Sequence, residues 1–176
     1  KKNRETGELE VQPAGEISSL VDIIARMQQG NMGVQQKNRL SSAIRQSYVD
    51  KGIAENLLGN YLTQDKFQSG YPSLRDVRDI LEQDNSQQAA SVMSYIDELL
   101  NLNLVRSTNE VERTFDEMMA SKIVLNFNEI QSEEIKNVLS ELIILRMHRY
   151  LLTGEQPHKL KRMLFFDEAW RVKNCK

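Results

Sequence analysis

The chain has 176 residues, of which 40% are hydrophobic and 27% charged, with a formal net charge of −2. This composition excludes an intrinsically disordered chain, and the charge gives no overall basic signature of a nucleic-acid-binding domain. The single cysteine, Cys175, excludes an intramolecular disulfide. No uninterrupted apolar run is long enough for a transmembrane helix, so we expect no membrane span and a cytoplasmic protein.

The first third of the chain predicts helices after a polar start. Residues 1–16 contain glycines and a proline among polar residues, which predicts an irregular lead-in. From Ile17 onward, apolar residues recur at spacings of three and four, which predicts a helix that ends at Gly30. A second helix is expected to end at Lys51-Gly52, and residues 53–70 predict mainly loop.

The middle of the chain continues the helical pattern. Ser73 follows a proline, and Asp76 stands three residues later, as in a capping box at the start of a helix. We therefore predict a helix over residues 74–83 and another over residues 87–104. Together, residues 17–120 are expected to form one helical subdomain.

The pattern changes in residues 121–176. Ile123 to Phe127 is short, apolar and rich in β-branched residues, which is typical of a buried strand. A long helix is predicted over residues 134–152, and Met163 to Phe166 predicts a second strand. Two parallel strands joined by a helix form a right-handed crossover. The predicted fold is therefore mainly α, with a small parallel β-α-β unit at the C-terminal end.

Two adjacent carboxylates, Asp167 and Glu168, follow the second predicted strand. Ligands of open parallel sheets bind in the crevice beyond the carboxyl ends of the strands. At such a position Asp167 can hold Mg²⁺, directly or through water, and Glu168 can orient or deprotonate an attacking water. Glu129 follows the first predicted strand and is an accessory candidate for the same crevice. The chain contains no Gly-x-x-x-x-Gly-Lys-Ser/Thr loop, so we assign no phosphate-binding residue in it.

The run Leu164-Phe165-Phe166-Asp167-Glu168-Ala169-Trp170 resembles the Walker B segment of the HerA/FtsK superfamily of P-loop motor ATPases. It is most similar to the branch that contains HerA-like DNA-processing ATPases and the conjugative-transfer ATPases of type IV secretion. The segment from Lys122 to Phe127 and the helix after it resemble the strand and helix that precede Walker B there. The segment from Tyr71 to Val77 resembles the start of the helical insertion between the two Walker motifs.

This resemblance implies a partial RecA-like α/β core at residues 121–176 and a helical insertion, or lid, at residues 17–120. It implies ATP and Mg²⁺ as cofactors, with Asp167 as the metal ligand and Glu168 as the catalytic residue. It also implies a DNA translocase or helicase that acts as a homo-hexamer, with partner proteins of a DNA-processing or secretion complex. Without a phosphate-binding loop, we expect this chain alone to be inactive.

Other interpretations stay open at this stage. Asp167-Glu168 can be a strand end that enters solvent, in a non-catalytic helical module that binds other proteins. Glu129 can be a loop residue that caps the next helix, and Trp170 is expected to pack in the interior rather than to stack on a base. His148 and His158 lack carboxylate partners at ligand spacing, so we expect no metal site at either.

Overall fold

The structure is a computed structural model that describes residues 8, 10–26, 32–101, 115–128, 130–153, 163 and 165. Helices dominate these residues, as the sequence predicts. In chain order the elements are β1 (Glu10–Val11), α1 (Pro13–Arg26), α2 (Val34–Asp50), the 3-10 helix η1 (Glu55–Leu57), β2 (Leu62–Thr63), the 3-10 helix η2 (Gln64–Phe67), α3 (Leu74–Glu82), α4 (Gln87–Asn101), α5 (Phe115–Met119) and α6 (Glu133–Thr153).

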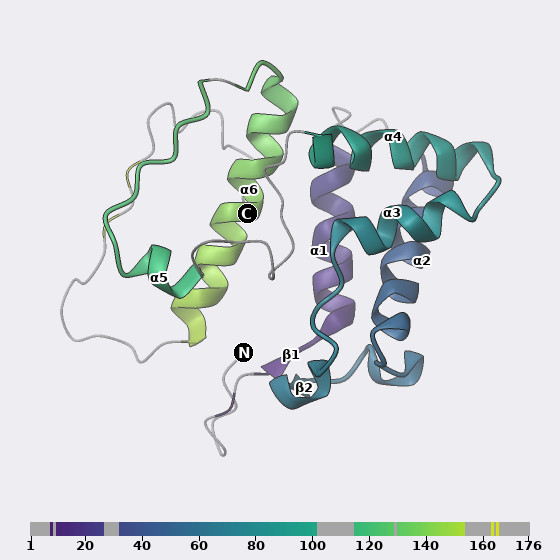
Figure 1. The fold of residues 1–176 in the computed structure, drawn as a ribbon, viewed down its shortest axis with the longest axis horizontal. Coiled ribbons are helices and arrows are strands. Elements are labelled where there is room, and N and C mark those ends of the chain that lie inside the picture. Colours follow the sequence, from purple (N-terminus) through teal and green to yellow (C-terminus); the bar gives the residue numbers. More distant parts are fainter. Residues whose placement is uncertain are drawn as a thin grey trace.

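Helices α1 to α4 pack against one another, and α6 lies alongside α1 on the opposite side from α2 (Figure 1). Their apolar faces meet in one core. Its innermost side chains have no solvent exposure at all: Ile24, Leu40, Ala89, Val92 and Ile96. The buried side chains of α6 belong to the same core cluster, so the predicted boundary near residue 120 does not divide the packing into two cores.

The start and end signals of two helices act as the sequence predicts. At the start of α3, the Ser73 hydroxyl accepts a hydrogen bond from the Asp76 N–H at 3.2 Å, and the Asp76 carboxylate accepts one from the Ser73 N–H at 2.7 Å. These bonds form the predicted capping box. At the end of α2, Gly52 takes a positive φ of 92°, a conformation that glycine adopts without a steric penalty.

Residues 10–16 differ from the irregular lead-in that is predicted for residues 1–16. Helix α1 begins at Pro13, because proline suits the first helical position, where its missing N–H costs nothing. Before it, β1 pairs with β2 in an antiparallel sheet, with Val11 opposite Leu62. The Ala14 N–H also donates to the Leu58 carbonyl at 2.8 Å. Residues 10–14 are thereby fixed to the loop after α2.

The predicted C-terminal helix is confirmed, because α6 spans Glu133–Thr153. The parallel β-α-β unit is not formed in the part of the chain that the structure describes. Residues 122–127 have no regular secondary structure, and the described positions of the second predicted strand, Met163 and Phe165, lie in no strand. A strand needs a neighbour for its backbone N–H and C=O groups, and the one sheet among the described residues, β1–β2, does not supply it.

No RecA-like core is therefore present among the described residues. Within the same residues, no helix combines the length and the apolar composition needed to cross a membrane.

Candidate functional site

The three carboxylates that the sequence singles out, Asp167, Glu168 and Glu129, lie outside the described residues, as does Trp170. The structure does describe what flanks them. Asn128 and Ile130 adjoin Glu129, and Phe165 stands two positions before Asp167. The site is therefore built here from its flanking segments and from α6, which joins them.

The chain on either side of Glu129 is ordered by two short-range hydrogen bonds. The side-chain oxygen of Asn126 accepts from the Asn128 N–H at 3.0 Å, and the Phe127 carbonyl accepts from the Ile130 N–H at 3.0 Å. Ile130 is buried in the main core. This turn leads the chain from the exposed residues 122–126, through the partly buried Phe127, into the start of α6.

The start of α6 is capped and acidic. The Ser132 hydroxyl accepts a hydrogen bond from the Ile135 N–H at 3.3 Å, and Glu133 and Glu134 occupy the first turn. Carboxylates at this position complement the positive end of the helix dipole. Because these charges already occupy the helix N-terminus, it is poorly suited to hold the phosphates of a nucleotide.

Apolar side chains on both predicted strands face solvent. Val124 is 92% exposed and Phe165 is 82% exposed, and Ile123, Leu125 and Met163 are also exposed. Figure 1 shows the trace between α5 and α6 running outside α6, away from the helices that form the main core. Both segments thus carry strand-forming side chains that the described part of the chain leaves uncovered.

Helix α6 is held against α1 by apolar contacts and one ion pair. Ile135, Val138 and Leu139 are buried at this junction. Beside them, the Arg26 guanidinium donates to Glu141 Oε2 through Nε at 2.9 Å and through the closer Nη2. Glu141 is only 8% exposed, so its carboxylate is a buried charge neutralised by a residue from another helix.

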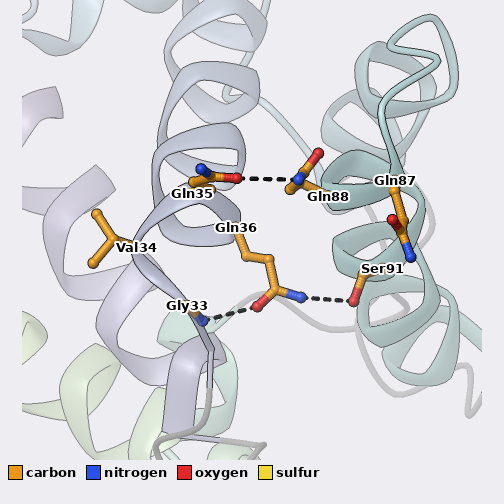
Figure 2. Close-up of a pocket in the computed structure, with 7 residues that line it drawn as sticks. All are labelled: Gly33, Val34, Gln35, Gln36, Gln87, Gln88 and Ser91. Carbon is orange, nitrogen blue, oxygen red and sulfur yellow. Dashed lines mark hydrogen bonds between the residues drawn. The ribbon is translucent and has the colours of Figure 1, made fainter.

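A groove lined by uncharged side chains lies between the N-terminal ends of α2 and α4 (Figure 2). Its volume is about 390 Å³. Across it, Gln36 Nε2 donates to Ser91 Oγ at 2.7 Å, and Gln88 Nε2 donates to Gln35 Oε1 at 3.1 Å. The lining groups include no acid or base that could activate the Ser91 hydroxyl, so the groove can bind through hydrogen bonds but cannot carry acid–base chemistry.

A second cavity, with a volume of about 530 Å³, is lined by residues of α3 and α4, among them Arg78 on α3. Arg78 lies 2.8 Å from Asp97 on α4 and 2.8 Å from Glu82 on its own helix. Hydrogen bonds to these two carboxylates raise the pKa of Arg78 above its ordinary value. The guanidinium therefore stays charged and joins α3 to α4, which is a structural role.

The described residues contain no group of three or more His, Cys, Asp or Glu side chains placed to hold a metal ion. His148 is exposed on α6, and His158 lies outside the described residues. The two carboxylates proposed for metal and water chemistry lie outside them as well, so the described geometry does not test that part of the prediction.

Sequence reasoning missed the Arg26–Glu141 pair and the amide groove. Glu141 does carry a sequence signal, because it interrupts a densely apolar stretch of α6 that includes Leu139 and Leu142. Arg26, the partner of Glu141, carries no sequence signal of the pairing, since it is 115 positions away in the chain. The glutamines of the groove likewise come from two helices whose proximity depends on packing.

No family model matches the chain, and neither a curated protein nor a solved structure matches it. The similarity to motor ATPases therefore depends on the segment from Leu164 to Trp170 and its surroundings in the sequence.

Proposed function

We propose that the chain is part of a HerA/FtsK-like P-loop ATPase that uses ATP and Mg²⁺ to move or remodel DNA. Asp167 holds the metal ion, and Glu168 orients or deprotonates the water that attacks the γ-phosphate. The observation that carries the proposal is the apolar run that ends in Asp167-Glu168 and continues as Ala169-Trp170. DNA as the substrate and a homo-hexameric assembly follow from the resemblance of this run to the family.

The exposed apolar segments support the proposal. Segment 122–127 precedes α6 in the chain, and Met163 and Phe165 follow it. The apolar side chains of Val124 and Phe165 are 92% and 82% exposed. Exposed apolar area is unfavourable in water, at about 25 cal/mol per Å². Strands of a parallel sheet bury both faces. We infer that these segments become neighbouring strands once further strands of the ATPase sheet cover them.

That arrangement would bring the candidate carboxylates together. In a β-α-β unit the two strands run in the same direction, so their carboxyl ends lie at one edge of the sheet. Glu129 follows the first segment and Asp167 follows the second, which assigns both to that edge. The phosphate-binding loop must come from outside these 176 residues, since no Gly-Lys-Ser/Thr sequence occurs in them.

The test is ATP hydrolysis by the full-length gene product that contains these residues. Glu168→Gln should lower kcat by about 10²- to 10⁴-fold while ATP stays bound, because the amide cannot accept the proton from water. The matched control is Glu98→Gln, a change of an exposed carboxylate on α4 that should leave kcat unaltered. Undiminished hydrolysis by Glu168→Gln would assign the base elsewhere, with Glu129 as the next candidate.

The second candidate is a non-catalytic helical module that binds other proteins. It is favoured by the uncharged groove between α2 and α4, whose amides can pair with the backbone of a partner. The two functions separate in the same assay. A full-length product that contains no phosphate-binding loop and shows no hydrolysis leaves the binding module as the function.

A further inference from the structure

The contact between α1 and α6 combines buried apolar side chains with a directional ion pair, Arg26–Glu141. Val138 and Leu139 contribute apolar contacts, which tolerate small shifts of one helix along the other. The Arg26 guanidinium donates two hydrogen bonds to a single carboxylate oxygen of Glu141. Sliding α6 by one helical turn, about 5.4 Å, breaks both bonds.

The energetics of such a pair favour a role in orientation over a role in net stability. Glu141 is 8% exposed, so removal of Arg26 alone leaves a buried charge without its partner. Replacement of both side chains by apolar groups of similar size removes that cost and is often neutral. What the apolar replacement cannot reproduce is the fixed register of the two helices.

The register of α6 on α1 matters because α6 lies between the two candidate carboxylate segments in the chain. Helix α6 begins at Glu133, shortly after Glu129, and its other end leads toward Asp167. A shift of α6 against α1 therefore also shifts Ile130 and the turn that leads into α6.

We propose that Arg26 and Glu141 are positioning residues that fix the register of α6 on α1, and through it the place of the candidate catalytic edge. The effect of this pair on catalysis rests on the proposed ATPase function. The register of α6 on α1 does not depend on that function.

The register is tested by the distance between spin labels on the two helices. Labels are attached at Asp22→Cys on α1 and Asn137→Cys on α6, two exposed positions, in a Cys175→Ser background. The pair is then replaced by Arg26→Met with Glu141→Leu. We expect an unchanged or higher Tm and a broadened or shifted distance distribution. The same narrow distribution as in the unsubstituted pair overturns the proposal.

Two further variants keep this result interpretable. The control is Lys136→Gln with Glu133→Gln, which removes an ion pair of 2.8 Å within α6 that does not reach α1; the distribution should stay narrow. The charge exchange Arg26→Glu with Glu141→Arg should restore a narrow distribution if the interaction is direct. Unfolding of both the apolar and the exchanged variants overturns the proposal, because the pair would then hold the fold and not the register.

The catalytic consequence is tested in the full-length gene product. Arg26→Met with Glu141→Leu should lower kcat for ATP hydrolysis by about tenfold or more, with little change in the KM for ATP, since misplacement by about 1 Å can cost 10²-fold. Unchanged kcat together with a broadened distribution overturns this consequence. An unsubstituted protein without any hydrolysis contradicts the proposed function instead, and the label distances still decide the register.

Discussion

At the scale of single residues, the Asp76 carboxylate at the start of α3 has polar partners on two elements. Its carboxylate accepts from the Ser73 N–H and hydroxyl, both at 2.7 Å, and pairs with Lys51 Nζ at 3.0 Å. Partial burial raises the pKa of Asp76, but the hydrogen bonds from Ser73 and the charge of Lys51 outweigh it, so the pKa lies below its ordinary value. The carboxylate thus links the start of α3 to the end of α2.

We predict that Asp76→Asn destabilises the protein at pH 7 by about 1 kcal/mol, because the neutral amide loses the charge that pairs with Lys51 and strengthens the Ser73 hydrogen bonds. The contribution of Asp76 depends on pH because the folded pKa lies below the unfolded value of about 3.9. The unfolded state therefore binds the proton more readily, and stability from this group is present above about pH 4. It is lost as the pH falls through the folded pKa. Urea unfolding at pH 7, 5 and 3 measures the change.

The control for this prediction is Asp22→Asn, which alters an exposed carboxylate on α1. Its free energy of unfolding should differ from that of the parent by less than about 0.5 kcal/mol at each pH. An Asp76→Asn deficit that is as large at pH 3 as at pH 7 would show that the charge of Asp76 has no part in the effect.

At the scale of elements, α4 supplies the centre of the core. Ala89, Val92 and Ile96 have no solvent exposure, and they recur at helical spacing on one face. Val34 is the opposite case, because it begins α2 with its side chain 75% exposed. Truncation of an apolar side chain to alanine can therefore be compared at a buried position on α4 and at an exposed position on α2.

Truncation of Ile96 to alanine should lower the free energy of unfolding by about 2–5 kcal/mol, because it removes buried methyl groups and leaves a cavity. The matched change Val34→Ala should cost less than about 0.5 kcal/mol. Chemical denaturation of both variants makes the comparison. Equal losses for the two would contradict the packing of α4 described above.

The elements also show what the sequence can and cannot predict. Helix α3 was predictable because Ser73 and Asp76 cap it locally, and the end of α2 because Gly52 stops it locally. Strands β1 and β2 were missed, since each is only two residues long and its pairing joins Val11 to Leu62. Pairs this short leave no periodicity in the sequence. The segment 123–127 was predicted as a strand from its β-branched residues, but a strand forms only where a neighbour accepts its hydrogen bonds.

At the scale of the whole molecule, the candidate site also has residues that the sequence predicts and contacts that it does not. The Asp167-Glu168 pair is visible in the sequence because the chemistry proposed for it depends on adjacent residues after an apolar run. The Arg26–Glu141 pair is not visible, because it depends on two helices meeting across 115 positions. The sequence thus predicts which residues carry the chemistry, whereas the contacts that position them require the fold.

The exposed segment 122–127 gives a prediction for the assembled protein. Its backbone amides should exchange with solvent rapidly in the 176-residue chain, since no regular secondary structure protects them. In the full-length gene product we expect exchange slower by on the order of 10²-fold or more, because strand pairing protects amides. Hydrogen–deuterium exchange followed by mass spectrometry measures both.

The amides of α4 provide the internal reference, because this helix is already packed in the core and should be protected equally in both proteins. Equal and rapid exchange of segment 122–127 in both proteins would contradict its assignment as a strand of a larger sheet.

The proposal that the chain carries the metal-and-water half of an ATPase site is tested most directly by the rate of Mg²⁺-dependent ATP hydrolysis. The full-length gene product is compared with its Asp167→Asn and Glu168→Gln variants, with Glu98→Gln as the control. We predict hydrolysis by the parent and the control, and a loss of about 10²-fold or more in both site variants. Hydrolysis that survives unchanged in both site variants, or is absent from the parent, would contradict the account.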